Sequence, residues 1–155
     1  MPLPPPLQGD ARSLQMARHA LPLLVWCAQH ECTVTYGILA KHIQEKHEVG
    51  GSTRGYNQPL VWIGQALAIT EGEWNRRVPM INTLVVSKKS GFPASGYTRF
   101  WNTYAVHPVY PRHPMTEQNR DGIIAHEQRL CFQFDRWDEL LQEYGLRIPA
   151  DFTGF

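Results

Sequence analysis

The sequence has almost no net charge and no long hydrophobic run. Its 15 Lys and Arg residues are nearly matched by 14 Asp and Glu, a formal charge of +1. Nucleic-acid binding would therefore need a local cluster of basic side chains. The longest apolar run, Leu21 to Ala28, is far shorter than the roughly 20 residues that cross a bilayer, and MPLPPPLQGD lacks the regions of a secretory signal. We expect no membrane partner and a cytoplasmic location.

Recognisable metal, disulfide and catalytic motifs are also missing. Cys27, Cys32 and Cys131 form no CxxC pair, and their odd number argues against a disulfide framework. The histidines show no HExxH spacing. The segment EVGGSTRG lacks the lysine of a phosphate-binding loop, and SGFPASG lacks the GxSxG pattern of a nucleophilic serine. We therefore expect no cofactor and no metal. An enzyme that uses His107, His113 or the glycine-rich loop is a third hypothesis, for which the sequence offers no complete catalytic site.

The remaining composition is that of a globular protein. Hydrophobic residues make up 43% of the chain and charged residues 19%, which excludes a disordered chain. The length suits one domain. We expect a proline-rich arm over residues 1–9, extended because each proline disfavours helical backbone before it, and a single domain over residues 10–155.

Apolar residues recur at helical spacing in several segments. The spacing predicts a helix over residues 10–29, which Pro22 should kink or split. Thr35 can cap a short helix over residues 36–44, and Pro59 suits the first turn of a third helix that includes residues 60–70. Two further helices are predicted near the C-terminus, one over residues 117–132 after Thr116 and one from a cap at Asp135 to Tyr144.

A stretch rich in β-branched residues follows the third helix. Residues 81–86 suit a strand, Ser90-Gly91 suits a turn, and GYTRFW at residues 96–101 suits the return strand. Short helices followed by a β-hairpin are typical of winged-helix domains, whose third helix enters the major groove of DNA. The sequence therefore predicts an α+β fold, a winged-helix-like helix-turn-helix with a β-hairpin wing and extra C-terminal helices.

Three short motifs occur in an order known from one protein family. They are YGILAK at residues 36–41, IGQAL at residues 63–67, and VP, VV and SG within residues 78–91. In this order, over residues 33–96, the chain resembles the DNA-binding domain of the alkylguanine DNA alkyltransferases and their alkyltransferase-like relatives. The family pattern runs YGxLA, a recognition helix, IPCHRVV and a glycine-rich wing. The resemblance implies a DNA-binding scaffold in which Tyr36 contacts the DNA backbone near a flipped nucleotide.

The residues that transfer an alkyl group in that family are missing. The reactive cysteine follows the proline, where this chain has Met80; counted back from Val85-Val86 instead, the position is Asn82. Neither side chain is a nucleophile that accepts an alkyl group. Val61 stands where the family has its finger arginine. The resemblance therefore implies DNA binding without alkyl transfer.

A DNA interface also needs cations and stacking surfaces. In a winged-helix arrangement, six basic residues around the third helix and the hairpin would lie near one surface, where they could contact phosphates. They are Arg54, Arg76, Arg77, Lys88, Lys89 and Arg99. Lysines in hairpins, however, often serve only to keep a protein soluble. Trp62, Trp74 and Trp101 are aromatic candidates for a flipped base, but core packing explains each of them better. The predicted nucleic-acid-binding residues are Tyr36, Arg54, Gln65, Arg76, Arg77, Lys88, Lys89 and Arg99.

Two functions stay open at this point. The first is a non-enzymatic DNA-binding protein that acts in regulation or senses DNA structure or damage. The second is a protein-interaction module, such as a small inhibitor or immunity-type protein, without nucleic-acid binding. The near-zero net charge and the apolar segment LVWIGQALAI at residues 60–69 favour the second, because few polar side chains on it can contact base edges.

Overall fold

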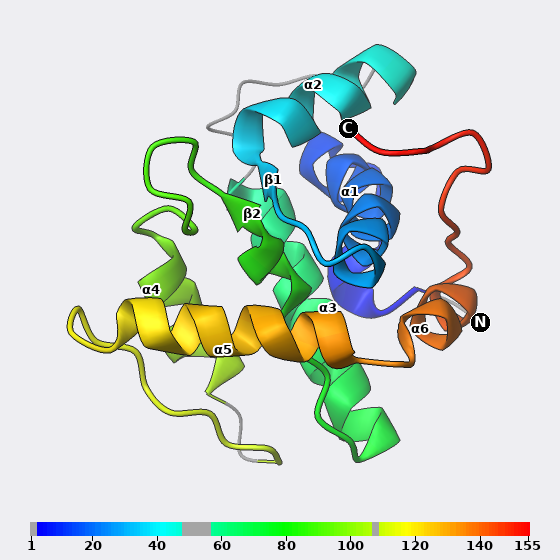
Figure 1. Ribbon diagram of the computed structural model, residues 1–155. Helices are drawn as coiled ribbons and strands as arrows, with labels where there is room; N and C mark the ends of the chain where they lie inside the picture. Colours follow the sequence, from blue (N-terminus) through cyan, green and yellow to red (C-terminus); the bar gives the residue numbers. More distant parts are fainter. Residues whose placement is uncertain (1–2, 48–56, 107–108) are drawn as a thin grey trace.

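The structure is a computed structural model that describes residues 3–47, 57–106 and 109–155. It is mostly helical with one small parallel sheet, which is compatible with an α+β fold. Helix α3, Asn57–Trp74, runs through the middle and packs against α1, Arg12–Gln29 (Figure 1). In the described residues, no helix is both long enough and apolar enough to span a membrane.

Helix α1 begins two residues later than predicted and ends at the predicted residue. Ten of its residues between Met16 and Ala28 are buried, and the unbroken run from Ala20 to Val25 is covered on all sides of the helix. Pro22 lies inside the helix and is itself buried, and the helix continues through it. The predicted split at Pro22 was therefore wrong, since packing on both sides of the proline holds the helical backbone.

The N-terminal prolines form a turn and not an extended arm. Residues Pro5–Leu7 make one turn of 3₁₀ helix, η1, and Leu7 is fully buried against α1 and α3. The guanidinium of Arg18 donates to the carbonyl oxygens of Leu7 and Gly9, at 2.7 and 2.8 Å. Burial of Leu7 and these two hydrogen bonds overcome the extended preference of the prolines.

The predicted start of the second helix is confirmed. Strand β1, Val34–Thr35, leads directly into α2, Tyr36–His47. The hydroxyl oxygen of Thr35 accepts a hydrogen bond from the amide of Ile38 at 3.3 Å, as expected of a capping residue. Leu39, Ala40 and Ile43 form the buried face of α2.

The predicted β-hairpin was wrong. Residues Ile81–Leu84 form a 3₁₀ turn, η3, and only Val85–Val86 is a strand, β2. Strand β2 pairs in parallel with β1, with Val34 opposite Val85 and Thr35 opposite Val86. Its partner therefore lies far earlier in the chain, and residues 87–96 form a loop that leaves the sheet (Figure 1).

The predicted return strand over residues 96–101 is helical. It consists of α4, Tyr97–Phe100, and a π-helical turn η4, Trp101–Ala105. Tyr97, Phe100 and Trp101 are buried, and their spacing of three and four residues places them on one helical face. Burial of these three rings therefore favours a helix over the strand that the aromatic composition suggested.

The two C-terminal helices are present with shifted starts. Helix α5 is Arg120–Gln133 and helix α6 is Trp137–Tyr144. Thr116 lies in a turn before α5, where its hydroxyl accepts from the amide of Asn119 at 3.3 Å. Gly145 ends α6 with φ of +69°, a left-handed conformation that favours glycine. Asp135 does not cap α6, because it pairs with Arg76.

Candidate functional site

A small cavity lies at the N-terminal end of α3, where the loop over residues 87–96 returns to the domain. Its volume is about 100 Å³. Three aromatic rings and two carboxamides contribute to its wall. The lining residues are Tyr36, Asn57, Leu60, Val61, Asn82, Gly96, Tyr97 and Phe100.

The side chain of Asn82 is held in one orientation at the wall of this cavity. Its Nδ2 donates to the carbonyl oxygen of Leu60 at 3.0 Å, and its Oδ1 accepts from the hydroxyl of Tyr97 at 2.9 Å. Burial raises the pKa of Tyr97 well above its usual range, so the hydroxyl stays protonated and remains a donor. The buried amide is therefore oriented by two hydrogen bonds.

The close approach of α3 to the cavity wall depends on a glycine. A Cβ at Gly64 would lie 2.1 Å from Cζ of Phe100 and 2.9 Å from Nδ2 of Asn82. Neither distance is possible between real atoms without a shift of the ring or of the amide. Gly64 therefore allows Phe100 and Asn82 to pack directly on α3.

Tyr36 lines the cavity and also contacts the loop over residues 87–96. Its hydroxyl oxygen accepts a hydrogen bond from the amide of Ala94 at 2.9 Å, a bond that does not use the hydroxyl hydrogen. Burial raises the pKa of Tyr36, so this hydrogen stays in place near neutral pH. The predicted contact residue Tyr36 thus lies at the cavity with a hydrogen-bond donor group.

Helix α5 supports the same loop from the other side. The guanidinium of Arg120 donates to the carbonyl oxygens of Pro93 and Ala94, at 2.7 and 2.8 Å, and to the hydroxyl of Thr98 at 3.1 Å. Sequence reasoning did not identify Arg120, because nothing near it in the sequence indicates a loop as its partner.

Met80 and Asn82, the two positions that the resemblance offers for a reactive cysteine, lie in different surroundings. Met80 is fully buried in the core, and its amide donates to Oε2 of Glu127 at 2.8 Å. Asn82 lines the cavity. The position counted back from Val85-Val86 is therefore the one that a molecule in the cavity would contact.

A second, open hollow lies beside the cavity and contains two of the predicted residues. It has a volume of about 560 Å³ and shares Val61, Gly96 and Phe100 with the cavity. Gln65 reaches it from α3, and Arg99 reaches it from α4. The structure thus brings Gln65 and Arg99 together across one hollow.

Lys88 and Lys89 are exposed in the turn at the start of the 87–96 loop. The amide of Gly91 donates to the carbonyl of Ser87 at 2.9 Å, and Gly91 has φ of +73°, so the turn needs its glycine. The same loop reaches the cavity at Gly96. Both lysines are therefore carried by the segment that borders the cavity.

Arg76 and Arg77 lie just after the other end of α3. Arg76 pairs with Asp135 at 2.9 Å, and Arg77 pairs with Glu127 at 2.8 Å. An 18-residue helix is about 27 Å long, so the structure does not bring these arginines together with the cavity. Arg54 lies outside the described residues.

The tryptophans are held by contacts within the domain. Trp101 is buried and donates to the carbonyl oxygen of His113 at 2.8 Å. Trp74 donates to Glu143 at 2.8 Å and lies under the guanidinium of Arg136. Trp62 donates to the hydroxyl of Ser13 at 3.2 Å, and its ring lines the hollow. Trp62 alone of the three thus borders the candidate site.

The largest side-chain network that sequence reasoning missed supports the segment before η3. Arg112 and Glu71 form a buried ion pair, and Arg112 also donates to the carbonyl oxygen of Val78 at 2.8 Å. The carboxylate of Glu71 accepts from the amide of Val78 at 2.9 Å. With the bond from Met80 to Glu127, these contacts hold the Val-Pro-Met segment and hence the start of η3.

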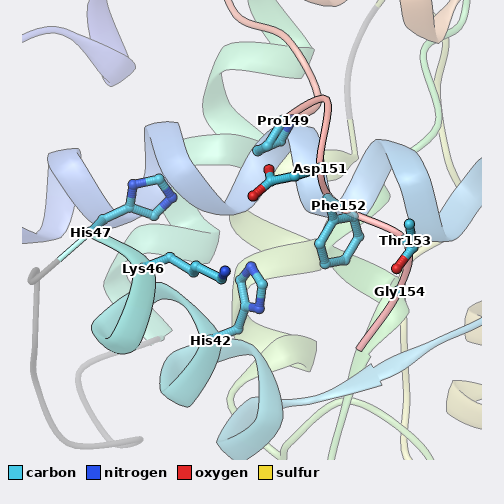
Figure 2. Close-up of a pocket in the computed structure, with 8 residues that line it drawn as sticks. All are labelled: His42, Lys46, His47, Pro149, Asp151, Phe152, Thr153 and Gly154. Carbon is cyan, nitrogen blue, oxygen red and sulfur yellow. The ribbon is translucent and has the colours of Figure 1, made fainter.

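A separate pocket of about 440 Å³ lies between α2 and the C-terminal tail. Figure 2 shows His42, Lys46 and His47 on α2, with Asp151 and Phe152 of the tail across from them. Phe152 packs edge-on against His42, with ring centroids 5.1 Å apart. The tail thus packs against its own domain.

In the described part of the chain, no group of three or more His, Cys, Asp or Glu side chains could hold a metal ion.

Two histidines in this region, His19 and His42, have lowered pKa values. His47 stacks on His19 of α1, with ring centroids 3.8 Å apart. Burial, and then the neighbouring charges of His47 and Arg18, lower the pKa of His19. Burial also lowers the pKa of His42, helped by Lys46 and His47 and opposed by Glu45 and Asp151. The imidazole of His42, against which the tail packs, is therefore largely neutral near neutral pH.

Comparisons of the chain with protein-family models, with curated proteins and with solved structures found no match.

Proposed function

We propose that the protein binds DNA without catalysing a reaction on it, and that the cavity at Tyr36, Asn82 and Tyr97 receives a nucleobase turned out of the duplex. One observation carries the proposal: an aromatic cavity with an oriented amide lies next to the loop that bears Lys88 and Lys89. The loop would take the part of a wing on an alkyltransferase-like scaffold.

The size and lining of the cavity suit a single planar ring. At about 100 Å³ the cavity is below the roughly 300–1,000 Å³ of sites for drug-sized ligands. Enzymes and sensors that extrude a base hold it against aromatic or apolar side chains and hydrogen-bond its edge. The rings of Tyr97 and Phe100 and the hydroxyl of Tyr36 provide these two kinds of contact.

The residue at the cavity wall supports a proposal of binding without reaction. A carboxamide is not a nucleophile, and both ends of the Asn82 amide already form hydrogen bonds within the domain. Asn82 would therefore contact a base without bonding to it covalently. This is the behaviour of a sensor.

Exposed cations on the loop over residues 87–96 and on α4 would supply the contacts to phosphate. Among the described residues, no carboxylate forms an ion pair with Lys88, Lys89 or Arg99. Lys and Arg near DNA neutralise phosphates and release counterions, so their contribution falls as salt rises. Arg76 and Arg77 are left out of this interface, because each is paired with a carboxylate elsewhere.

The second candidate is a protein-interaction module. Two observations favour it: most of α3 is buried, and two large apolar side chains, Ile38 of α2 and Ile69 of α3, are exposed. Eight residues of this helix are buried, so only one flank of it is open to a partner. Ile38 and Ile69 are large apolar side chains that are 50% and 38% exposed. A protein partner would cover such side chains, whereas DNA would not require them.

A titration of labelled DNA separates the two candidates. Fluorescence anisotropy would be measured with a short duplex that contains one mismatched base pair, at several salt concentrations. We expect binding that weakens steeply with salt and is lost in the double variant Lys88→Glu, Lys89→Glu. The matched control is Arg129→Glu, Arg147→Glu, which reverses two exposed charges late in α5 and after α6, away from the loop (Figure 1). The control should bind like the unmodified protein. Failure of the unmodified protein to bind at low salt would exclude the first candidate.

A further inference from the structure

The open hollow beside the cavity has two walls with distinct side chains. Helix α3 contributes Gln58, Trp62 and Gln65, which are spaced four and three residues apart and so share a face. The α4 and η4 segment contributes Arg99 and Tyr104 from the other side. None of the described residues that line the hollow is acidic. The hollow therefore combines aromatic rings, amides and one positive charge.

Two of the three aromatic rings that line the hollow are partly exposed. The indole of Trp62 is half-buried and anchored through Nε1 to Ser13, so only part of the ring is open. Tyr104 is 40% exposed, and its ring centroid lies 5.7 Å from that of Phe100. Aromatic side chains and a nearby cation are the features with which proteins hold unpaired nucleotides, because every base has a face that can stack.

Phe100 lies at the boundary between the hollow and the cavity, since it lines both. Val61 and Gly96 are shared in the same way. A base in the cavity and a second base in the hollow would therefore lie near the same phenylalanine, as two neighbouring nucleotides of one strand would. The second base can reach the hollow only when it too has left the stack of the duplex.

We infer that the hollow holds the nucleotide next to the base in the cavity, and that the preferred substrate is DNA with two or more consecutive unpaired nucleotides. This inference rests on the proposed function and makes it narrower. A fully paired duplex would use only the lysine contacts, a single mismatch would add the cavity, and a short unpaired segment would add the hollow.

Four labelled probes of one length test the inference: a fully paired duplex, a duplex with one mismatch, a duplex with a short internal loop, and a single strand. We expect the looped and single-stranded probes to bind roughly tenfold more tightly than the duplex with one mismatch, the order of magnitude of one base-aromatic stack. Tyr104→Ala should remove that advantage and leave binding to the paired and the single-mismatch duplexes within about twofold.

Two variants serve as controls. Tyr104→Phe keeps the ring and should keep the preference. Ile69→Ala truncates an exposed side chain of α3 that does not line the hollow, and it should change nothing. A melting temperature for each variant shows that it is folded.

The possible results distinguish the inference from the proposed function. Equal affinity for all four probes, or an unchanged preference in Tyr104→Ala, would overturn the inference while the protein still binds DNA. Failure to bind any probe at low salt would overturn the proposed function and the inference with it.

Discussion

Arg112 and Glu71 form a buried ion pair in which the two Nη atoms of Arg112 lie 2.8 and 3.2 Å from the two carboxylate oxygens of Glu71. The exposed fractions of the side chains are 1% and 0%. Burial disfavours the charge on Arg112, but the hydrogen bond to Glu71 and the charges of Glu127 and Glu71 outweigh it and raise the pKa of the guanidinium. The guanidinium therefore stays charged, and its ion pair with Glu71 links the end of α3 to the segment that leads into η3.

Arg112→Met should strongly destabilise the protein. It removes the cation beside Glu71 and Glu127 and leaves both carboxylates buried. Breaking a buried pair on one side costs about 3–5 kcal/mol. Urea unfolding monitored by circular dichroism measures this loss. The exposed pair between Arg136 and Glu139 is the comparison, and Arg136→Met should cause a much smaller loss. Similar losses in both variants would contradict the assigned role of Arg112.

Gly64→Ala and Gly72→Ala should act in opposite directions although both lie in α3. The new methyl at position 64 would overlap Phe100 and Asn82, and overpacking of this kind costs about 1–3 kcal/mol. A Cβ at Gly72 meets nothing within 4 Å, so alanine there should stabilise the helix by up to about 1 kcal/mol. Melting temperatures test both. A stabilised Gly64→Ala variant would mean that Phe100 does not pack against the helix as described.

Tyr36→Phe should loosen the loop over residues 87–96 with little effect on the rest of the fold. The amide of Ala94 loses its acceptor, while the aromatic ring stays in place. We expect faster hydrogen-deuterium exchange within this loop and unchanged exchange in α1. Tyr110→Phe is a matched control, because it removes a hydroxyl that donates to the carbonyl oxygen of Asn75, away from the loop. If the loop over residues 87–96 exchanges at the same rate in the Tyr36→Phe variant, the hydrogen bond between Tyr36 and Ala94 does not hold the loop.

Stability should fall as the pH is lowered through the range in which histidine titrates. His19 and His42 have lowered pKa values in the folded protein, whereas their unfolded values are about 6.5. Below about pH 6.5 the unfolded chain binds protons that the folded protein does not bind, so the free energy of unfolding decreases. Above about pH 7.5 both states are neutral at these residues, and this contribution to the pH dependence disappears.

Denaturant unfolding at pH 7.5 and pH 5.5 measures that difference. The double variant His19→Gln, His42→Gln should show a smaller loss of stability between the two pH values than the unmodified protein. His126→Gln, which changes an exposed histidine of α5, serves as the control and should retain the full loss. An unchanged loss in the double variant would show that other groups cause the pH dependence.

The sequence predicted the N-terminal helices well because their signals are local. The spacing of apolar residues in α1 and the cap at Thr35 depend only on residues within one or two turns. The prediction of a β-hairpin was wrong because strand pairing depends on distant residues. Residues 81–86 have β propensity, but the partner of β2 is β1, which no local signal identifies. The sequence shows the helical spacing of Tyr97, Phe100 and Trp101, but aromatic residues also favour strands, so composition and spacing indicate different structures here.

The candidate site was predictable only in part. Lys88 and Lys89 are exposed in a turn, as the Ser-Gly signal indicated. The sequence offered Met80 and Asn82 as alternatives for the position of the reactive cysteine. Only the path of the backbone through η3 shows that Asn82 lines the cavity. Arg76 and Arg77 could not be separated from the other cations, because their carboxylate partners lie in or after α5. Long-range ion pairs of this kind have no sequence signature.

The parallel pairing of β1 with β2 has a consequence for how the chain acquires its structure. Val34 can meet Val85 only after α2 and α3, which lie between them in the chain, have been made and brought into place. Contacts between residues so far apart in sequence carry a closure entropy that slows folding. During synthesis, therefore, a nascent chain that ends before β2 leaves β1 without its neighbour and the cavity without a wall.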